Sequence, residues 1–192
     1  MADDKAKTRH FTRVEYERLV DLSVFQPGEA IELIGGELMV AEPQGAPHYA
    51  AIRKTAKALE AAFGPGWDVR TQGPIGLDED SEPEPDVAVV PGEPDDYARA
   101  HPSRPVLTVE VAESSLRADR QHKGSLYARA GLADYWVLNL VDRALEVYRE
   151  PVADSAAPFG WWYGRSEVFD ASARVTPLAA PDASILVSRL LP

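Results

Sequence analysis

Two acidic residues and one lysine have the types and positions that hydrolytic chemistry requires. Asp86 directly precedes the apolar segment 87–90, Glu110 lies within the apolar segment 106–111, and Lys123 follows in a predicted helix. Both apolar segments are rich in β-branched residues, which indicates strands. The strand at 106–111 is largely apolar on both faces, so a carboxylate in it is costly unless a cation or a basic side chain compensates its charge. We therefore expect a cation or a basic side chain next to Glu110.

The spacing of Lys123 predicts where such a partner comes from. Leu126 and Tyr127 follow it at steps of three and four, so the three side chains occupy adjacent positions on one helical face. If Leu126 and Tyr127 pack on the sheet, the Lys123 ammonium group is carried toward Asp86 and Glu110.

Two carboxylates and a lysine suit metal-assisted hydrolysis. Carboxylate oxygens bind a divalent cation, and the cation lowers the pKa of a bound water molecule. A lysine can orient that water or stabilise the charge that develops on phosphate. A structural ion pair of Glu110 with Lys123 or an arginine uses the same residue types, and that interpretation stays open at this point.

Composition sets limits on the fold and on the partners. The chain has 192 residues, of which 45% are hydrophobic and 27% charged, as in one soluble globular domain. We expect residues 1–10 to be a disordered tail and residues 11–192 a single domain. The absence of Cys excludes disulfides, Cys-ligated zinc and thiol catalysis. With no signal sequence and no apolar run of membrane-spanning length, we expect a cytoplasmic protein.

The elements that position the candidate residues follow from periodicity and from Gly and Pro. A capping box at 12–15 predicts a short helix, and Gly35-Gly36 between two apolar arms predicts a hairpin over 31–40. A helix opening at 47–48 and stopping at 64–66 should turn five residues inward: Tyr49, Ile52, Ala56, Leu59 and Phe63. A further helix should run from Ser114 or Ser115 to about Ala130, with Gly131 as its C-terminal cap.

The remaining segments predict further strands. Residues 67–71 alternate as a strand does, with 75–77 as a candidate continuation of the sheet. Residues 135–140 and 144–148 should form a hairpin. We also expect strands at 159–163 and 174–176, and a short helix or strand within 183–191.

The ordered set of residues between 85 and 136 resembles the Uma2 family, a branch of the PD-(D/E)XK restriction-endonuclease-like superfamily. The resemblance spans roughly residues 12–150. It rests on Pro85-Asp86-Val87, Val109-Glu110-Val111, Asp119, Lys123, Tyr127, Gly131 and Asp134-Tyr135-Trp136, and more weakly on Gly36-Glu37-Leu38 and His48. It implies an α/β fold with a mixed, bent sheet flanked by helices.

The resemblance also implies roles for particular residues. Asp86 and Glu110 would be metal ligands with the Val111 carbonyl, and Lys123 would be the catalytic lysine. The superfamily pattern places this lysine two residues after the acid on the same strand, where the present chain has Ala112. Lys123 must therefore replace it from the following helix. Glu37 and His48 would support the site. An exposed hairpin position explains Glu37 about as well, and a local hydrogen bond at the helix start is the commoner role for a residue placed like His48.

Other polar and aromatic residues have simpler interpretations. Asp86 alone resembles a turn residue, and Lys123 alone a solvated one. Asp119, four residues before Lys123, is explained by a helical ion pair. The cluster Trp161-Trp162-Tyr163 fits burial in a core or a dimer interface better than stacking on bases.

Together, the candidate site residues and the resemblance favour an endonuclease that hydrolyses DNA phosphodiester bonds with Mg²⁺ or Mn²⁺, as a homodimer. The net charge of −11 opposes general nucleic-acid binding, because phosphate contacts rely on Lys and Arg. Two alternatives stay open. One is a non-catalytic interaction protein on a nuclease fold, and the other is a metal-dependent hydrolase of a small phosphate ester.

Overall fold

The computed structural model describes residues 8–26, 28–40 and 44–192. Residues 1–7 of the predicted tail lie outside these ranges. At the end of that segment, Arg9 pairs with Glu15 and the His10 ring lies 3.1 Å from the Gly35 carbonyl oxygen. No helix in the described part of the chain is long and apolar enough to cross a membrane.

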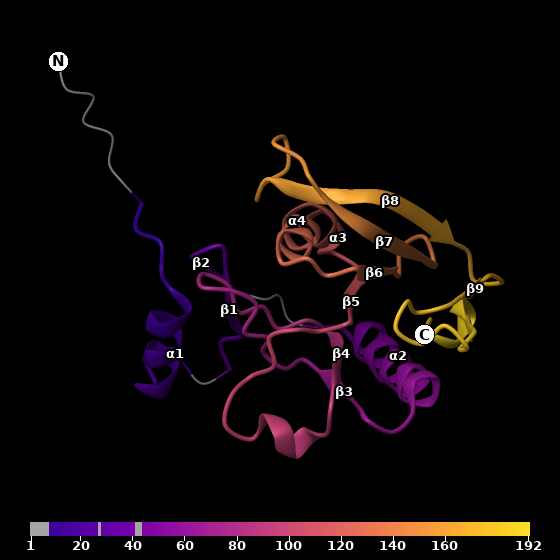
Figure 1. Ribbon diagram of the computed structural model, residues 1–192, viewed down its shortest axis with the longest axis horizontal. Helices are drawn as coiled ribbons and strands as arrows, with labels where there is room; N and C mark the ends of the chain where they lie inside the picture. Colours follow the sequence, from indigo (N-terminus) through magenta and orange to yellow (C-terminus); the bar gives the residue numbers. More distant parts are fainter. Residues whose placement is uncertain (1–7, 27, 41–43) are drawn as a thin grey trace.

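A six-stranded mixed sheet forms the centre of the molecule (Figure 1). Its strands follow the chain in the order β3-β4-β5-β6-β7-β8, and β5 and β6 are the parallel pair. The strands are β3 (Trp67–Thr71), β4 (Val87–Pro91), β5 (Leu107–Ala112), β6 (Asp134–Asn139), β7 (Ala144–Ala153) and β8 (Trp161–Phe169). Every residue of β5 and β6 is buried, which confirms that the strand carrying Glu110 is covered on both faces.

Helix α2 (Ala46–Phe63) covers one face of this sheet. Ile52, Ala56 and Leu59 pack against apolar side chains of β4 to β7, as predicted. Tyr49 was expected to point inward but is 56% exposed. The buried stripe instead passes through His48, four residues before Ile52, which leaves Tyr49 at the helix surface.

The opposite face carries α4 (Gly124–Arg129), over which β7 and β8 curve (Figure 1). Tyr127 packs there with Tyr135 and Tyr163 from the sheet. The helix predicted between Ser115 and Ala130 is present but interrupted: α3 (Leu116–Ala118) is followed by a π-helical turn at Asp119–Lys123. Gly131 follows the last turn at φ +76°, the left-handed conformation expected of a C-terminal glycine.

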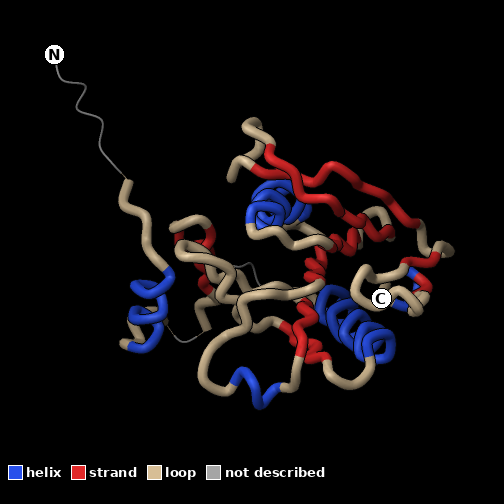
Figure 2. Tube along the Cα trace, in the orientation of Figure 1, coloured by secondary structure: helices blue, strands red, loops and turns tan. Residues whose placement is uncertain are grey.

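The N-terminal elements lie beside the main sheet, joined to it through loops (Figure 2). Helix α1 (Arg13–Asp21) begins with the predicted capping box of Thr12 and Glu15. Strands β1 (Ile31–Ile34) and β2 (Glu37–Val40) form the predicted hairpin around Gly35 and Gly36. Residues 75–77 are not a strand; Ile75 is instead a buried anchor of the loop between β3 and β4.

The C-terminal segment completes the core beside α2. Strands β9 (Arg174–Val175) and β10 (Ile185–Leu186) pair with each other and are followed by a 3₁₀ turn at Val187–Arg189. The predicted helix or strand at 183–191 is therefore a short strand and then a single turn. A second 3₁₀ turn, Pro94–Tyr97, lies between β4 and β5.

Candidate active site

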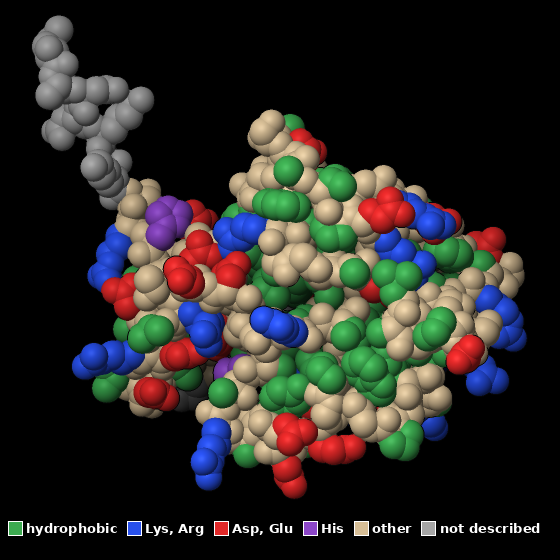
Figure 3. Space-filling view, in the orientation of Figure 1, with side chains coloured by type: hydrophobic (Ala, Val, Ile, Leu, Met, Phe, Trp, Pro, Cys, Tyr) green, Lys and Arg blue, Asp and Glu red, His purple; other side chains and the backbone are tan. Residues whose placement is uncertain are grey.

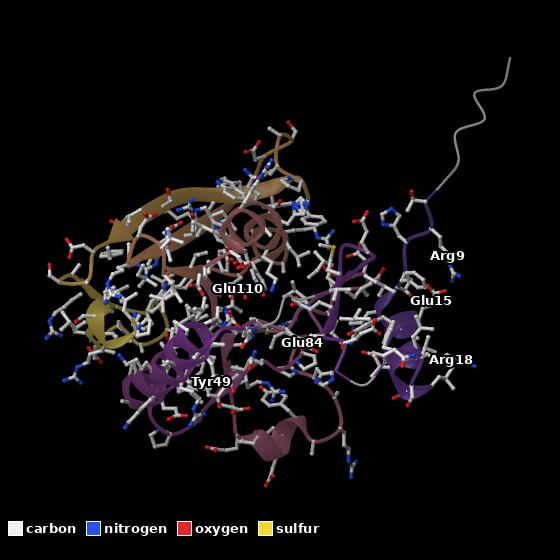
Figure 4. The ribbon with its side chains drawn as sticks, turned by 180° about the vertical axis from the view of Figure 1, so that it is seen from behind. Arg9, Glu15, Arg18, Tyr49, Glu84 and Glu110 are labelled. Carbon is white, nitrogen blue, oxygen red and sulfur yellow. The ribbon has the colours of Figure 1, made fainter. Side chains whose placement is uncertain are left out.

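Asp86 and Glu110 lie side by side on adjacent antiparallel strands. Val87 is opposite Val109 in the β4–β5 register, so Asp86 is brought next to Glu110 and Val111. The Val111 amide donates to Asp86 Oδ2 at 2.8 Å, and the Asp86 amide lies 3.5 Å from Glu110 Oε2. Both carboxylates are buried, with 8% and 2% of their residue surface exposed. Figure 4 shows Glu110 at the middle of the molecule, beneath the helical segment that follows β5.

Lys123 contacts Glu110 directly, as its helical spacing predicted. Its Nζ atom lies 3.2 Å from Glu110 Oε1, and the Tyr127 hydroxyl donates to the same oxygen at 2.8 Å. Leu126 and Tyr127 are fully buried, so the face that carries Lys123 is indeed the one turned to the sheet. The ammonium group makes no direct ion pair with Asp86 within the described residues.

Glu32 is a member of this group that sequence reasoning missed. Its Oε2 atom lies 3.2 Å from Lys123 Nζ and accepts a 3.3 Å hydrogen bond from the Glu84 amide. Glu32 is 7% exposed although it lies in the short apolar strand β1. That is the same signal that marked Glu110, an acidic residue within an apolar strand. Figure 4 shows Glu84 between Glu110 and the N-terminal elements.

Glu37 lies apart from the group that the structure brings together. It is exposed on β2, opposite Ile34 in the hairpin register. Within the described residues, its side chain forms no hydrogen bond or ion pair with Asp86, Glu110 or Lys123. The hairpin faces the site with its first arm, and therefore with Glu32.

His48 reaches the site from the first turn of α2. Its Nε2 atom lies 2.5 Å from the Val111 carbonyl oxygen and 3.3 Å from Asp86 Oδ2. Burial opposes protonation of the ring, but the hydrogen bonds and the Asp86 charge outweigh it and raise the His48 pKa above its usual 6.5. The Nδ1 atom is buried without a hydrogen-bond partner in the described part of the chain.

Asp119 is also buried beside the site. Its carboxylate accepts a 2.6 Å hydrogen bond from the Ser115 hydroxyl, and within the described residues no direct ion pair joins it to Lys123. The helical ion pair suggested by the spacing of these two residues is therefore absent. Burial raises the pKa of Asp119, while the Lys123 charge lowers it.

The electrostatics of the group leave negative charge uncompensated. Burial raises the pKa of Glu110. The positive charge of Lys123 lowers this pKa, and the negative charges of Asp119, Asp86 and Glu32 raise it further. Burial lowers the pKa of Lys123, but the surrounding carboxylates outweigh it and raise the pKa above its ordinary value. One ammonium group thus faces several carboxylates, and additional positive charge would stabilise the site.

The donor atoms fit a divalent cation that prefers oxygen. Asp86 Oδ1 and Glu110 Oε2 each have a long contact, 3.5 Å to Gln44 and to the Asp86 amide. The Val111 carbonyl oxygen retains a lone pair beside its contact with His48. These three oxygens suit Mg²⁺ or Mn²⁺. No group of three or more His, Asp or Glu side chains arranged as metal ligands exists among the described residues, so a cation here would also need water ligands.

The mixed sheet flanked by helices is the α/β architecture that was predicted, and it is shared with a solved structure described as a putative nuclease. The family model described as "Uma2: Putative restriction endonuclease" matches residues 13–188, and the chain belongs to this family. This description indicates a nuclease-like function.

The fold is also found among solved structures, one of which illustrates the likeness. It is described as "a putative nuclease belonging to DUF820 from Anabaena variabilis ATCC 29413". The sequences are 20% identical, the match covers 88% of the present chain and 94% of the other, and the TM-score is 0.66. No curated protein was found to match the chain.

Proposed function

We propose that the protein is a divalent-metal-dependent endonuclease that hydrolyses DNA phosphodiester bonds. The observation that carries this proposal is the position of Lys123, 3.2 Å from Glu110 and adjacent to the Asp86–Val111 pair. A purely structural ion pair would explain Glu110 and Lys123 alone. It would not explain why Asp86, Glu32 and Asp119 are buried around the same ammonium group.

Asp86, Glu110 and the Val111 carbonyl would hold the cation. When bound there, a divalent cation lowers the pKa of a coordinated water molecule and offsets charge on a phosphate oxygen. The remaining residues act on position and charge. Tyr127 fixes one oxygen of Glu110 and leaves the other available, and His48 holds Asp86 and the Val111 carbonyl in place.

Lys123 supplies a fixed positive charge next to the carboxylates. Glu110 and Glu32 orient its ammonium group, whose protons can donate to an attacking water or to a phosphate oxygen. We assign the additional acidic position to Glu32 in place of Glu37, because Glu32 contacts Lys123 and Glu37 does not. Cleavage of both DNA strands would be served by two copies of the chain, each contributing one site.

The test is plasmid nicking with Mg²⁺ or Mn²⁺ by the wild type and by Glu110→Gln and Lys123→Met. We expect each substitution to reduce the metal-dependent rate by about 10²-fold or more, the usual effect of removing a preorganised charge. Glu37→Gln is the matched control, because it removes a carboxylate from the same hairpin outside the site, and it should retain activity.

Three outcomes would count against the proposal. Nicking that survives Glu110→Gln would show that the activity comes from another site. Cleavage of small phosphodiesters without nicking of plasmid would favour a hydrolase of small substrates. No cleavage, together with no calorimetric signal for Mg²⁺ or Mn²⁺ binding, would favour an interaction protein that keeps the nuclease fold.

A further inference from the structure

The helix that carries Lys123 contains one turn with an unusual hydrogen-bond pattern. The Gly124 amide donates to the Asp119 carbonyl, five residues earlier, which makes Asp119–Lys123 a π-helical turn. Such turns are rare and less favourable than α-helix, so tertiary contacts must hold this one. The preceding helix α3 has three residues and contributes little stability of its own.

The tertiary contacts of this turn come from the sheet. Arg120 forms a two-pronged ion pair with Glu146 of β7, with Nε and Nη2 donating at 2.8 and 2.5 Å. The Tyr135 hydroxyl of β6 donates to the Asp119 carbonyl at 2.9 Å. Glu146 is 4% exposed and the Arg120 side chain 40% exposed, so the pair is anchored in the body of the protein at its carboxylate end.

The π-helical turn accommodates one residue more than an α-helix would, so both ends of the helix keep their contacts. Each residue of an α-helix rotates by about 100°, so one residue more or fewer redirects every side chain beyond it. Upstream, Asp119 meets Ser115 and Arg120 meets Glu146; downstream, Lys123 meets Glu110. A regular α-helix through this segment would have to give up one of these sets.

We propose that the π-helical turn, clamped by Arg120 and Glu146, is the device that positions Lys123 in the candidate active site. Arg120 and Glu146 are then positioning residues that act through Lys123. This inference rests on the proposed function for its catalytic consequence. The position of Lys123 itself can be measured whether or not the protein cleaves DNA.

Two variants test the clamp and the turn. Arg120→Lys keeps the positive charge but cannot form the two-pronged contact with Glu146. Glu146 keeps its hydrogen bonds from Asn139 and Tyr148, so the fold should survive. Inserting one alanine after Gln121 adds a second extra residue to the turn, which rotates Lys123 by about 100° relative to Arg120. The Gln121 side chain is exposed and contacts Arg117 Nε at 3.4 Å, so the added residue meets little packing.

The control is Arg129→Lys. Arg129 makes ion pairs of the same kind with Asp78 and Asp80, at 2.7 and 2.6 Å, but lies beyond the turn on α4. The Arg129→Lys variant should lose about as much stability as Arg120→Lys, but Lys123 should stay in place.

Two readouts are required. The first is nicking kinetics, in which Arg120→Lys and the alanine insertion after Gln121 should lower kcat by about 10- to 100-fold with KM nearly unchanged, as expected for misplacement of a reacting group. The second is the NMR signal of ¹³Cε-labelled Lys123 at fixed pH, assigned by its loss in Lys123→Met. It should shift in both variants and stay in place in Arg129→Lys.

The readouts separate the two proposals. If both variants lose thermal stability but keep kcat and the Lys123 signal, the clamp is only structural and the inference is wrong. If the wild type cleaves nothing, the proposed function fails, and the NMR signal alone then decides. A shift in the two variants would still support the positioning role, and no shift would overturn it.

Discussion

At the scale of single residues, the main feature is a set of buried carboxylates around one ammonium group. Glu110 and Lys123 could be paired from the sequence, because an acid in an apolar strand and a lysine on an apolar helical face each need a partner. Glu32 carries the same signal, but Glu37 begins the other apolar arm of the hairpin, so the signal does not choose between them. The two residues lie on opposite arms of one hairpin, and only the docking of that hairpin decides which arm faces the site.

Substitution of the two partners should change stability in opposite directions. Without metal at pH 7, Glu110→Gln should stabilise the protein by about 1–3 kcal/mol, because it removes a charge crowded by Asp86, Asp119 and Glu32 while Lys123 keeps Glu32. Lys123→Met should destabilise it by about 2–4 kcal/mol, because it leaves those carboxylates uncompensated. Urea unfolding measures both; a loss of stability in both variants would contradict this account.

Glu82 should make stability depend on pH. It is 4% exposed, and burial, followed by interaction with Glu17, raises its pKa to about 7 from an ordinary 4.5. A raised carboxyl pKa means that the folded state binds the proton more tightly. Its contribution to stability is therefore complete below pH 4.5 and is lost as the pH rises through 7.

Glu82→Gln tests this directly. At pH 8 the variant should unfold at a higher urea concentration than the wild type, and its free energy of unfolding should be larger by about 1–2 kcal/mol. This difference should shrink toward pH 5. Parallel pH profiles of the two proteins would show that Glu82 is not the group responsible.

At the scale of elements, the sequence predicted correctly those helix ends and turns that depend only on neighbouring residues. The Thr12 capping box, the Gly35-Gly36 hairpin and the Gly131 cap all lie where the sequence predicted them. The π-helical turn was not predicted, because its hydrogen bonds are set by contacts with β6 and β7 and not by helix propensity. The inward stripe of α2 passes through His48 because the site, and not only the core, lies beneath its first turn.

The junction of β6, β7 and the C-terminal segment depends on Asp134. This fully buried carboxylate accepts hydrogen bonds from Arg149, from the Trp136 indole and from the Leu178 amide, each at 2.8 Å. Asp134→Asn should therefore destabilise the protein by about 2–4 kcal/mol, since it leaves Arg149 without its charge partner. Glu167→Gln, which breaks the exposed Arg165–Glu167 pair, is the matched control and should cost less than about 0.5 kcal/mol in urea unfolding.

At the scale of the whole molecule, the acidic balance is the property most at odds with a DNA substrate. Figure 3 shows acidic and basic side chains interspersed, with no continuous basic stripe among the residues drawn on that face. The aromatic cluster is buried only in part: Tyr163 lies in the core and Trp162 contacts Tyr148, whereas Trp161 is 39% exposed and is the one ring of the three that is open at the surface. Under the proposed function, DNA would therefore be held mainly near Asp86, Glu110 and Lys123.

This charge distribution predicts an unusual salt dependence. For most DNA-binding proteins, added salt weakens binding through loss of counterion release. Here a net charge of −11 repels DNA at long range, and salt screens that repulsion beyond about 10 Å at 0.1 M. We expect kcat/KM for plasmid nicking at constant Mg²⁺ to stay level or rise between about 20 and 150 mM NaCl, because added salt screens this repulsion. A steep fall would reveal a local basic surface that binds phosphates.

The sequence by itself determined most of the elements and the central pair of Glu110 and Lys123, and its resemblance to the Uma2 family implied the fold class. The elements and the pair follow from local periodicity, from residues at turns, or from the cost of placing a charge in an apolar segment. Only the tertiary structure decided which further residues join the site. The docking of the hairpin brought Glu32 to Lys123, and the contacts of β6 and β7 with Asp119 and Arg120 set the turn that aims the lysine. Both depend on residues far apart in the chain, so no local pattern carries them.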